Sequence, residues 1–160
     1  MPSMPIRSLS ALLALALLTA TSAQAETKTS SFDARVQVTA TCSLTTADLS
    51  FPAITTGNLS NVDATSSINV TCSSGTPYQI SLSDGSNFNS TRRMAWGSSY
   101  IAYDLFSDSN RSQSWSSTAI VQGNGSGSTQ QIPLYGRIFS GQAVPNTGSY
   151  ADTIIATISY

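Results

Sequence analysis

Two cysteines and a small set of carboxylates are the side chains of this sequence best suited to chemistry. Cys42 and Cys72 form an even pair in a chain that begins with an export signal, and this pattern predicts one disulfide bond. Two free thiols or a shared metal ion are the alternatives. Because the sequence contains no histidine, two cysteines make a poor zinc-ligand set, and we expect no metal site.

The missing residue types argue against an enzyme. Without histidine, neither a Ser-His-Asp triad nor a Cys-His pair can form. Gly123, Gly125 and Gly127 lack the strand–helix context of a phosphate-binding loop. A glycosidase needs only two carboxylates, but most acidic residues here lie beside Gly, Ser or Asn in predicted turns, where Asp is common. We expect neither catalysis nor a cofactor; the acidic residues are Glu26, Asp33, Asp48, Asp63, Asp84, Asp104, Asp108 and Asp152.

Four aromatic residues offer a different kind of site. Trp96, Tyr100, Tyr103 and Trp115 could form a carbohydrate-binding face. We favour a role in the core and in contacts between subunits, because aromatic side chains dominate protein cores.

The first 25 residues have the organisation of a secretory signal peptide. Met1 to Arg7 carries one positive charge, Leu9 to Leu18 is largely apolar, and Ala23-Gln24-Ala25 supplies the small-x-small cleavage pattern. The apolar run is shorter than the roughly 20 residues that cross a bilayer. Cleavage leaves residues 26–160, enough for one domain. This exported part contains six basic and eight acidic residues, which gives no basic surface for nucleic acid.

The rest of the sequence has the pattern of an all-β domain. Short β-rich runs are separated by clusters of Gly, Ser, Asn, Asp and Pro, and strands at this spacing predict a sandwich. The runs are Ile68–Cys72, Tyr78–Leu82, Tyr100–Phe106, Gln131–Phe139 and Thr153–Tyr160.

The N-terminal alternating segment is too long for one strand of its own domain. Apolar and polar residues alternate from Phe32 to Cys42, a stretch that would span roughly 37 Å as a strand, whereas typical strands have about five or six residues. Its second half can pair internally and place Cys42 opposite Cys72. The part before it, from about residue 26 to residue 38, has an apolar face and no evident partner strand nearby in the sequence. A long first strand that bends across both sheets is the alternative.

The C-terminal segment, Tyr150 to Tyr160, is an alternating strand with no strand after it. An immunoglobulin-like sandwich normally has a seventh strand at this point. We therefore expect an unpaired edge beside an open apolar groove, a feature that monomers avoid. A spare strand at one end and a missing strand at the other indicate a polymer subunit, although many small β-domains also end on a strand.

Several motifs carry a resemblance to a known family. They are Asn69-Val70-Thr71-Cys72, Gly85, Arg93-Met94, Tyr103-Asp104-Leu105-Phe106 and Trp115, and the closing Gly148-Ser149-Tyr150-Ala151-Asp152 with the alternating residues up to Tyr160. With these motifs the sequence resembles the spore coat protein U domain family, which contains the pilins of archaic, Csu-type chaperone–usher pili.

The resemblance implies an incomplete immunoglobulin-like sandwich of six strands, 39–160, that lacks its last strand. A signal peptide (1–25) and an N-terminal donor strand (26–38) would precede it. A periplasmic chaperone would lend a strand to the open groove, an outer-membrane usher would secrete the subunit, and the next subunit's donor strand would then replace the chaperone's. The donor residues would be Phe32, Ala34, Val36 and Val38, and the chaperone and acceptor edge would be Ile154, Ala156, Ile158 and Tyr160.

The implied function is that of a structural subunit of a surface pilus that supports adhesion and biofilm formation, in a polymer of one or several kinds of subunit. Tip adhesins carry an additional N-terminal domain, so we expect a shaft or adaptor subunit. A structural protein of a spore or cell coat, and a monomeric carbohydrate-binding sandwich, are the alternatives.

Overall fold

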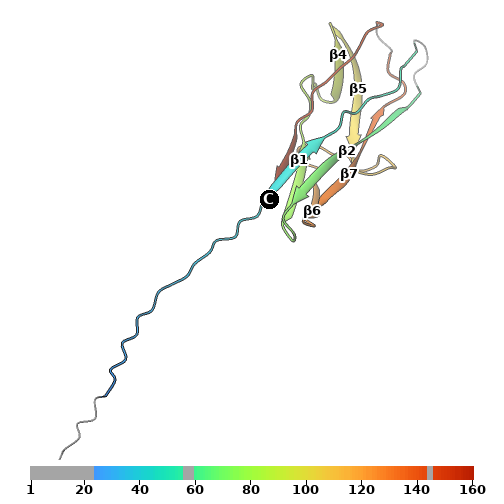
Figure 1. Cartoon of the computed structure of the whole chain (residues 1–160). Coiled ribbons are helices and arrows are strands. Elements are labelled where there is room, and N and C mark those ends of the chain that lie inside the picture. The colour runs from blue at the N-terminus through green and yellow to red at the C-terminus, as the bar shows by residue number, and fades with distance from the viewer. Residues whose placement is uncertain (1–23, 56–59, 144–145) are drawn as a thin grey trace, which may run out of the picture. The chain divides into compact units, whose positions relative to one another are not determined.

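The computed structural model describes residues 24–55, 60–143 and 146–160 (Figure 1). The chain divides into two units, residues 1–36 and residues 37–160, and each is considered by itself. The predicted signal peptide lies outside the described residues except for Gln24 and Ala25. Over the described ranges, no helix is long and apolar enough to cross a membrane.

The described residues of the second unit form eight strands in two sheets and no helix (Figure 1). The larger sheet has the order β1-β2-β7-β5-β4, and the smaller sheet has the order β6-β3-β8. The strands are β1 (Cys42–Thr46), β2 (Val62–Cys72), β3 (Pro77–Leu82), β4 (Arg92–Trp96), β5 (Ser99–Phe106), β6 (Val121–Asn124), β7 (Thr129–Ile138) and β8 (Ala156–Ser159).

The predicted all-β, immunoglobulin-like sandwich is confirmed, but the predicted number of six strands is wrong. The two additional strands are short. β4 forms a hairpin with β5, and β6 pairs with β3 at the edge of the smaller sheet. Neither strand shows a clear two-residue alternation in the sequence. Each is a strand because it pairs with a longer neighbour, β4 with β5 and β6 with β3.

Every second side chain of the strands points into the space between the two sheets, and these side chains form the core. In β3, Tyr78, Ile80 and Leu82 are buried, while Pro77 and Gln79 between and before them are exposed. β2 contributes Ile68, Val70 and Cys72 to the same core in the same way. Each large apolar side chain buried here contributes roughly 1.5–3 kcal/mol.

Two polar side chains tie the sheets together inside this core. Trp115 is fully buried, and its indole Nε1 donates to the carbonyl oxygen of Ile80 at 3.0 Å, while its backbone N–H donates to Leu105 at 2.8 Å. The guanidinium of Arg92, only 4% exposed, donates to the Asp104 carboxylate at 2.9 Å and to the carbonyl oxygen of Ser83 at 2.8 Å. The charge of Arg92 is thus paired and hydrogen-bonded, as a buried charge must be.

Candidate functional site

A groove runs along one side of the sandwich, between the chain that follows β1 and the chain that leads into β8. We call residues 46–54 the first wall and residues 146–156 the second wall. Two adjoining hollows of about 360 and 610 Å³ lie between the walls and share Leu49, Phe51, Met94 and Tyr150. The floor of the smaller hollow is apolar and consists of Ile68, Leu82, Tyr103, Leu105 and Leu134.

The first wall begins where β1 leaves β2. The Ser66 hydroxyl donates to the carbonyl oxygen of Ala47 at 2.9 Å, just after the strand ends. Leu49 and Phe51 then lie over Gly136 of β7. A Cβ at position 136 would come within 2.6 Å of Leu49 Cδ2 and 2.9 Å of Phe51 Cζ, so this wall requires a glycine beneath it.

The second wall presents an edge of the smaller sheet to the groove. The Ser83 N–H donates to the carbonyl oxygen of Ile155 at 2.8 Å, so the backbone groups of Ile155 face β3. Backbone groups alternate in direction along an antiparallel strand. Those of Ile154, Ala156 and Ile158 therefore point away from β3, on the side where β8 has no strand partner among the described residues.

The four residues predicted to form this edge do not all lie together. Ile154 and Ala156 line the groove, and these two and Ile158 pack against the core. Tyr160, in contrast, is 61% exposed and borders a separate depression that Gln79 and Gln122 of the smaller sheet also line. Ile154, Ala156 and Ile158 thus share an inward-facing side of this segment, whereas Tyr160 is exposed.

The second wall crosses from one sheet to the other at Asp152. Just before it, Ala151 pairs with Ala95 of β4 through hydrogen bonds of 2.9 and 3.1 Å. The Asp152 carboxylate accepts a hydrogen bond from the Tyr103 hydroxyl at 2.8 Å, and two more, at 3.1 Å, from the backbone and side-chain nitrogens of Asn87. Burial, and then the bond to Asp152, raise the pKa of Tyr103, so its hydroxyl remains a donor.

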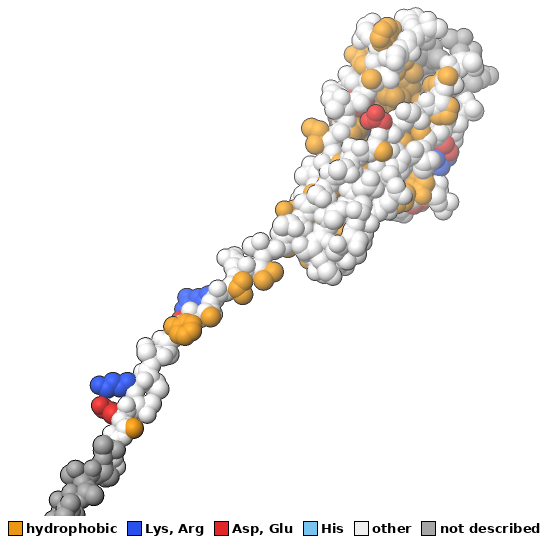
Figure 2. Space-filling model, viewed as in Figure 1, with side chains coloured by type: hydrophobic (Ala, Val, Ile, Leu, Met, Phe, Trp, Pro, Cys, Tyr) orange, Lys and Arg blue, Asp and Glu red, His pale blue; other side chains and the backbone are white. Residues whose placement is uncertain are grey.

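The N-terminal segment of residues 24–41 forms no helix or strand, and each of its side chains is exposed. Phe32, Val36 and Val38 are 89–90% exposed. The Arg35 guanidinium donates to the Asp33 carboxylate at 2.7 Å, a contact between positions i and i+2 that an extended backbone allows. Figure 2 shows hydrophobic side chains and charges of both signs in succession along this segment.

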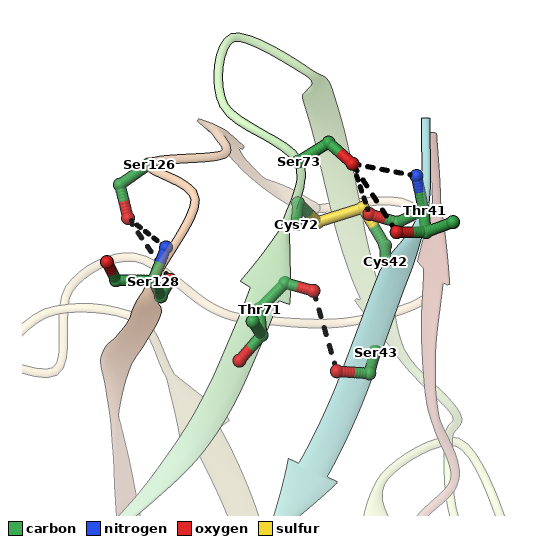
Figure 3. Close-up of a disulfide and its surroundings, with 8 residues drawn as sticks. All are labelled: Thr41, Cys42, Ser43, Thr71, Cys72, Ser73, Ser126 and Ser128. Carbon is green, nitrogen blue, oxygen red and sulfur yellow. Dashed lines mark hydrogen bonds between the residues drawn. A yellow bond between two sulfur atoms is a disulfide. The ribbon is translucent and has the colours of Figure 1, made fainter. Parts of the chain in front are cut away.

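Strand pairing begins later than the sequence indicated. The prediction that the second half of the segment 32–42 pairs internally is wrong up to Ala40, because β1 begins only at Cys42. The residue before it is nevertheless anchored (Figure 3): the N–H of Thr41 donates to Ser73 Oγ at 3.1 Å, and its carbonyl oxygen accepts from the Ser73 N–H at 2.9 Å.

The predicted disulfide is present. Cys42 lies directly opposite Cys72 in the β1–β2 register, and the two sulfur atoms are bonded (Figure 3). Both cysteines are therefore engaged. The bond closes the N-terminal end of β1, an edge strand of the larger sheet, onto its neighbour.

Asp63 is an example of an acidic residue whose carboxylate forms ion pairs within the sandwich. Asp63 accepts two bonds from Arg137, at 2.7 and 2.8 Å, and lies 3.3 Å from Arg111. The bond from Arg137 holds the pKa of Asp63 below its ordinary value. Among the described residues, no group of three or more potential ligands could hold a metal ion.

The four aromatic residues proposed as a carbohydrate-binding face do not form one surface. Tyr103 and Trp115 are buried, 5% and 0% exposed. Trp96 lies against Gly148, where a Cβ would collide with the indole ring. Tyr100 pairs with the neighbouring Ala95, which places it on the opposite face of the hairpin from Trp96. The structure thus offers no shared aromatic platform.

Residues 28–157 match the Spore Coat Protein U domain family. The chain belongs to this family. No curated protein matches the chain. Among solved structures, it is similar to the pre-assembly complex of the chaperone CsuC and the tip adhesion subunit CsuE, from the archaic chaperone–usher Csu pili of Acinetobacter baumannii.

That structural similarity has a TM-score of 0.61 at 23% sequence identity, and it covers 77% of this chain. It covers 40% of the solved chain, so this protein spans less than half of that chain's length. At this level of identity the similarity supports the fold and agrees with the two-sheet architecture described above. The family prediction made from the sequence motifs is confirmed.

Proposed function

We propose that this spore coat protein U domain protein is a structural subunit of a chaperone–usher surface pilus and that it polymerises by donor-strand exchange. The observation that carries the proposal is the groove, which has an apolar floor and lies beside outward-pointing backbone groups of Ile154, Ala156 and Ile158. An inserted strand can satisfy such an edge with its main chain while its alternate side chains fill the groove. Family membership and the similar fold of a pilus subunit support this role.

The N-terminal segment has the chemistry of that inserted strand. Phe32, Ala34, Val36 and Val38 would enter the groove of another subunit, and each large side chain would contribute roughly 1.5–3 kcal/mol when buried. On the alternate positions, Asp33 and Arg35 neutralise each other within the segment. The segment therefore needs no charged partner on the acceptor, which suits the uncharged outward residues of β8, Thr157 and Ser159.

Before assembly the apolar groove must be filled by another protein, and this need determines the proposed partners. A periplasmic chaperone would occupy it with a strand of its own, an outer-membrane usher would secrete the subunit, and other pilus subunits would replace the chaperone. The route leads through the periplasm to the cell surface, where the fibre would serve adhesion and biofilm formation. The role is structural, without catalysis or a cofactor. Genes for a chaperone and an usher beside this one would distinguish a pilus from a spore or cell coat.

The decisive variant is Val36→Asp. It places a charge where the groove receives an apolar side chain, and burying that charge unpaired is prohibitive. Gln37→Asp is the matched control, because it adds the same charge on the alternate face. The assay is the ladder of heat-resistant oligomers on a denaturing gel, together with the amount of chaperone-bound subunit.

We expect the ladder to disappear with Val36→Asp and to persist with Gln37→Asp, while both bind the chaperone normally. A normal ladder from Val36→Asp would refute the donor-strand assignment. Deleting residues 158–160 tests the acceptor side, since loss of this edge should abolish chaperone capture. Co-purification of that deletion with the chaperone at normal yield would contradict the proposed edge.

A further inference from the structure

One part-buried hydrogen bond, from Tyr103 to Asp152, joins the groove floor to the second wall. We propose that Tyr103 and Asp152 are positioning residues that hold the two walls at the separation an incoming strand requires. This inference rests on the proposed function. It assigns a role to the aspartate of the closing Gly-x-Tyr-x-Asp motif and to a tyrosine 49 residues earlier in the chain.

Tyr103 reaches both walls from the groove floor. It belongs to β5 of the larger sheet and is only 5% exposed. Its ring meets Phe51 of the first wall edge-on, with 6.0 Å between ring centroids. Its hydroxyl donates to Asp152 of the second wall at 2.8 Å. One rigid side chain therefore sets where each wall stands.

The surroundings of Asp152 are built to receive its carboxylate. Gly85 has a φ of +94°, and a Cβ at this position would collide with the carboxylate. Asn87 donates twice to the carboxylate and once, at 3.3 Å, to the carbonyl oxygen of Ala151. The Arg93 guanidinium in turn donates to the carbonyl oxygen of Asn87 at 2.6 Å. Asp152 is thus fixed from the loop side as well as from Tyr103.

The geometry of strand insertion explains why this spacing matters. Paired strands lie about 4.8 Å apart, so a strand inserted between two walls needs them roughly twice that distance apart. Hydrogen bonds weaken steeply once distance and angle leave a narrow range. Asp152 lies where the second wall leaves β4 and joins β3, between Ala151 and Ile155, so its position determines how far Ile154 and Ala156 stand from the first wall.

The experiment measures strand binding separately from stability. The full chain with Val36→Asp serves as an acceptor that cannot donate its own strand, and a fluorescent peptide of residues 26–38 is the probe. Peptide affinity is measured by fluorescence anisotropy, and the Tm by circular dichroism. Tyr103→Phe, Asp152→Ala and Asp152→Asn are compared with Val121→Ala, a core substitution in β6 outside the groove.

We expect Tyr103→Phe and Asp152→Ala to weaken peptide binding about tenfold or more, because each removes a hydrogen bond to a charged group. Asp152→Asn keeps one acceptor oxygen for Tyr103 and should recover much of the affinity. Val121→Ala should lower the Tm while leaving the affinity within about twofold of the parent.

Parent-like affinity in both Tyr103→Phe and Asp152→Ala would overturn the inference and leave the proposed function intact. Equal weakening by Val121→Ala would also overturn it, since the effect would then follow general stability. A parent that folds but does not bind the peptide would overturn the proposed function together with the inference.

Discussion

Removing the disulfide should be among the most damaging changes to the fold that leave the groove residues untouched. Cys42 and Cys72 are 30 residues apart, and for a loop of that length the chain-entropy model gives a stabilisation of roughly 3.6 kcal/mol. Cys72 is 2% exposed, so truncating it to alanine adds a packing loss of roughly 1 kcal/mol. The double variant Cys42→Ala/Cys72→Ala should therefore lose about 4–5 kcal/mol of unfolding free energy.

Urea unfolding followed by tryptophan fluorescence measures this loss, because Trp115 is fully buried in the native state. With a urea m-value of about 1–3 kcal/mol/M, a loss of this size should lower the midpoint by roughly 1.3–5 M. Reducing the parent protein should reproduce most of the shift. Ser43→Ala, a substitution of an exposed residue in the same strand, is the control and should leave the midpoint unchanged. A double variant within about 1 kcal/mol of the parent would refute the reasoning.

Three further predictions concern single residues. Arg92→Met leaves the Asp104 carboxylate without its ion-pair partner and should cost about 3 kcal/mol in urea unfolding; a loss below about 1 kcal/mol would contradict the assigned pair. Gly136→Ala forces Leu49 outward and should lower the unfolding free energy by about 1–3 kcal/mol. It should also weaken binding of the 26–38 peptide. Unchanged binding would show that the first wall adapts to the added methyl group. Because the pKa of Asp63 is lowered in the folded state, its contribution is present above its unfolded pKa and is lost as the pH falls through the folded value. The stability difference between the parent and Asp63→Asn should accordingly shrink as urea unfolding is repeated from about pH 5 to about pH 2, and a difference that is constant with pH would contradict this.

The sequence predicted those parts of the fold that depend on local alternation. β3 and β5 were found because each is a short β-rich run bounded by turn residues, and alternate residues along most of each strand are buried. The disulfide followed from an even cysteine count in an exported chain, and the β1–β2 register bears it out. These features need little knowledge of distant contacts, which is why one sequence sufficed.

The walls of the groove could not be predicted in the same way. Leu49 and Phe51 belong to no strand, and they are directed inward by the space above Gly136, a residue far away in the chain. The apolar type of these two residues was the only local clue. Tyr103 and Asp152 were both noticed as parts of motifs, but the bond between them depends on how two sheets meet.

The anchoring of Thr41 and the disulfide beside it have a mechanical consequence. Under the proposed assembly, tension along a fibre enters each subunit through the residues just before β1. Pulling on the end of an edge strand ordinarily breaks its hydrogen bonds one pair at a time, which requires little force. Here the first β1–β2 pair is Cys42 and Cys72, joined covalently. Tension applied at Thr41 therefore passes directly into the long strand β2, which is paired with β7 on its other side, and β1 cannot be peeled away from this end while the disulfide is intact.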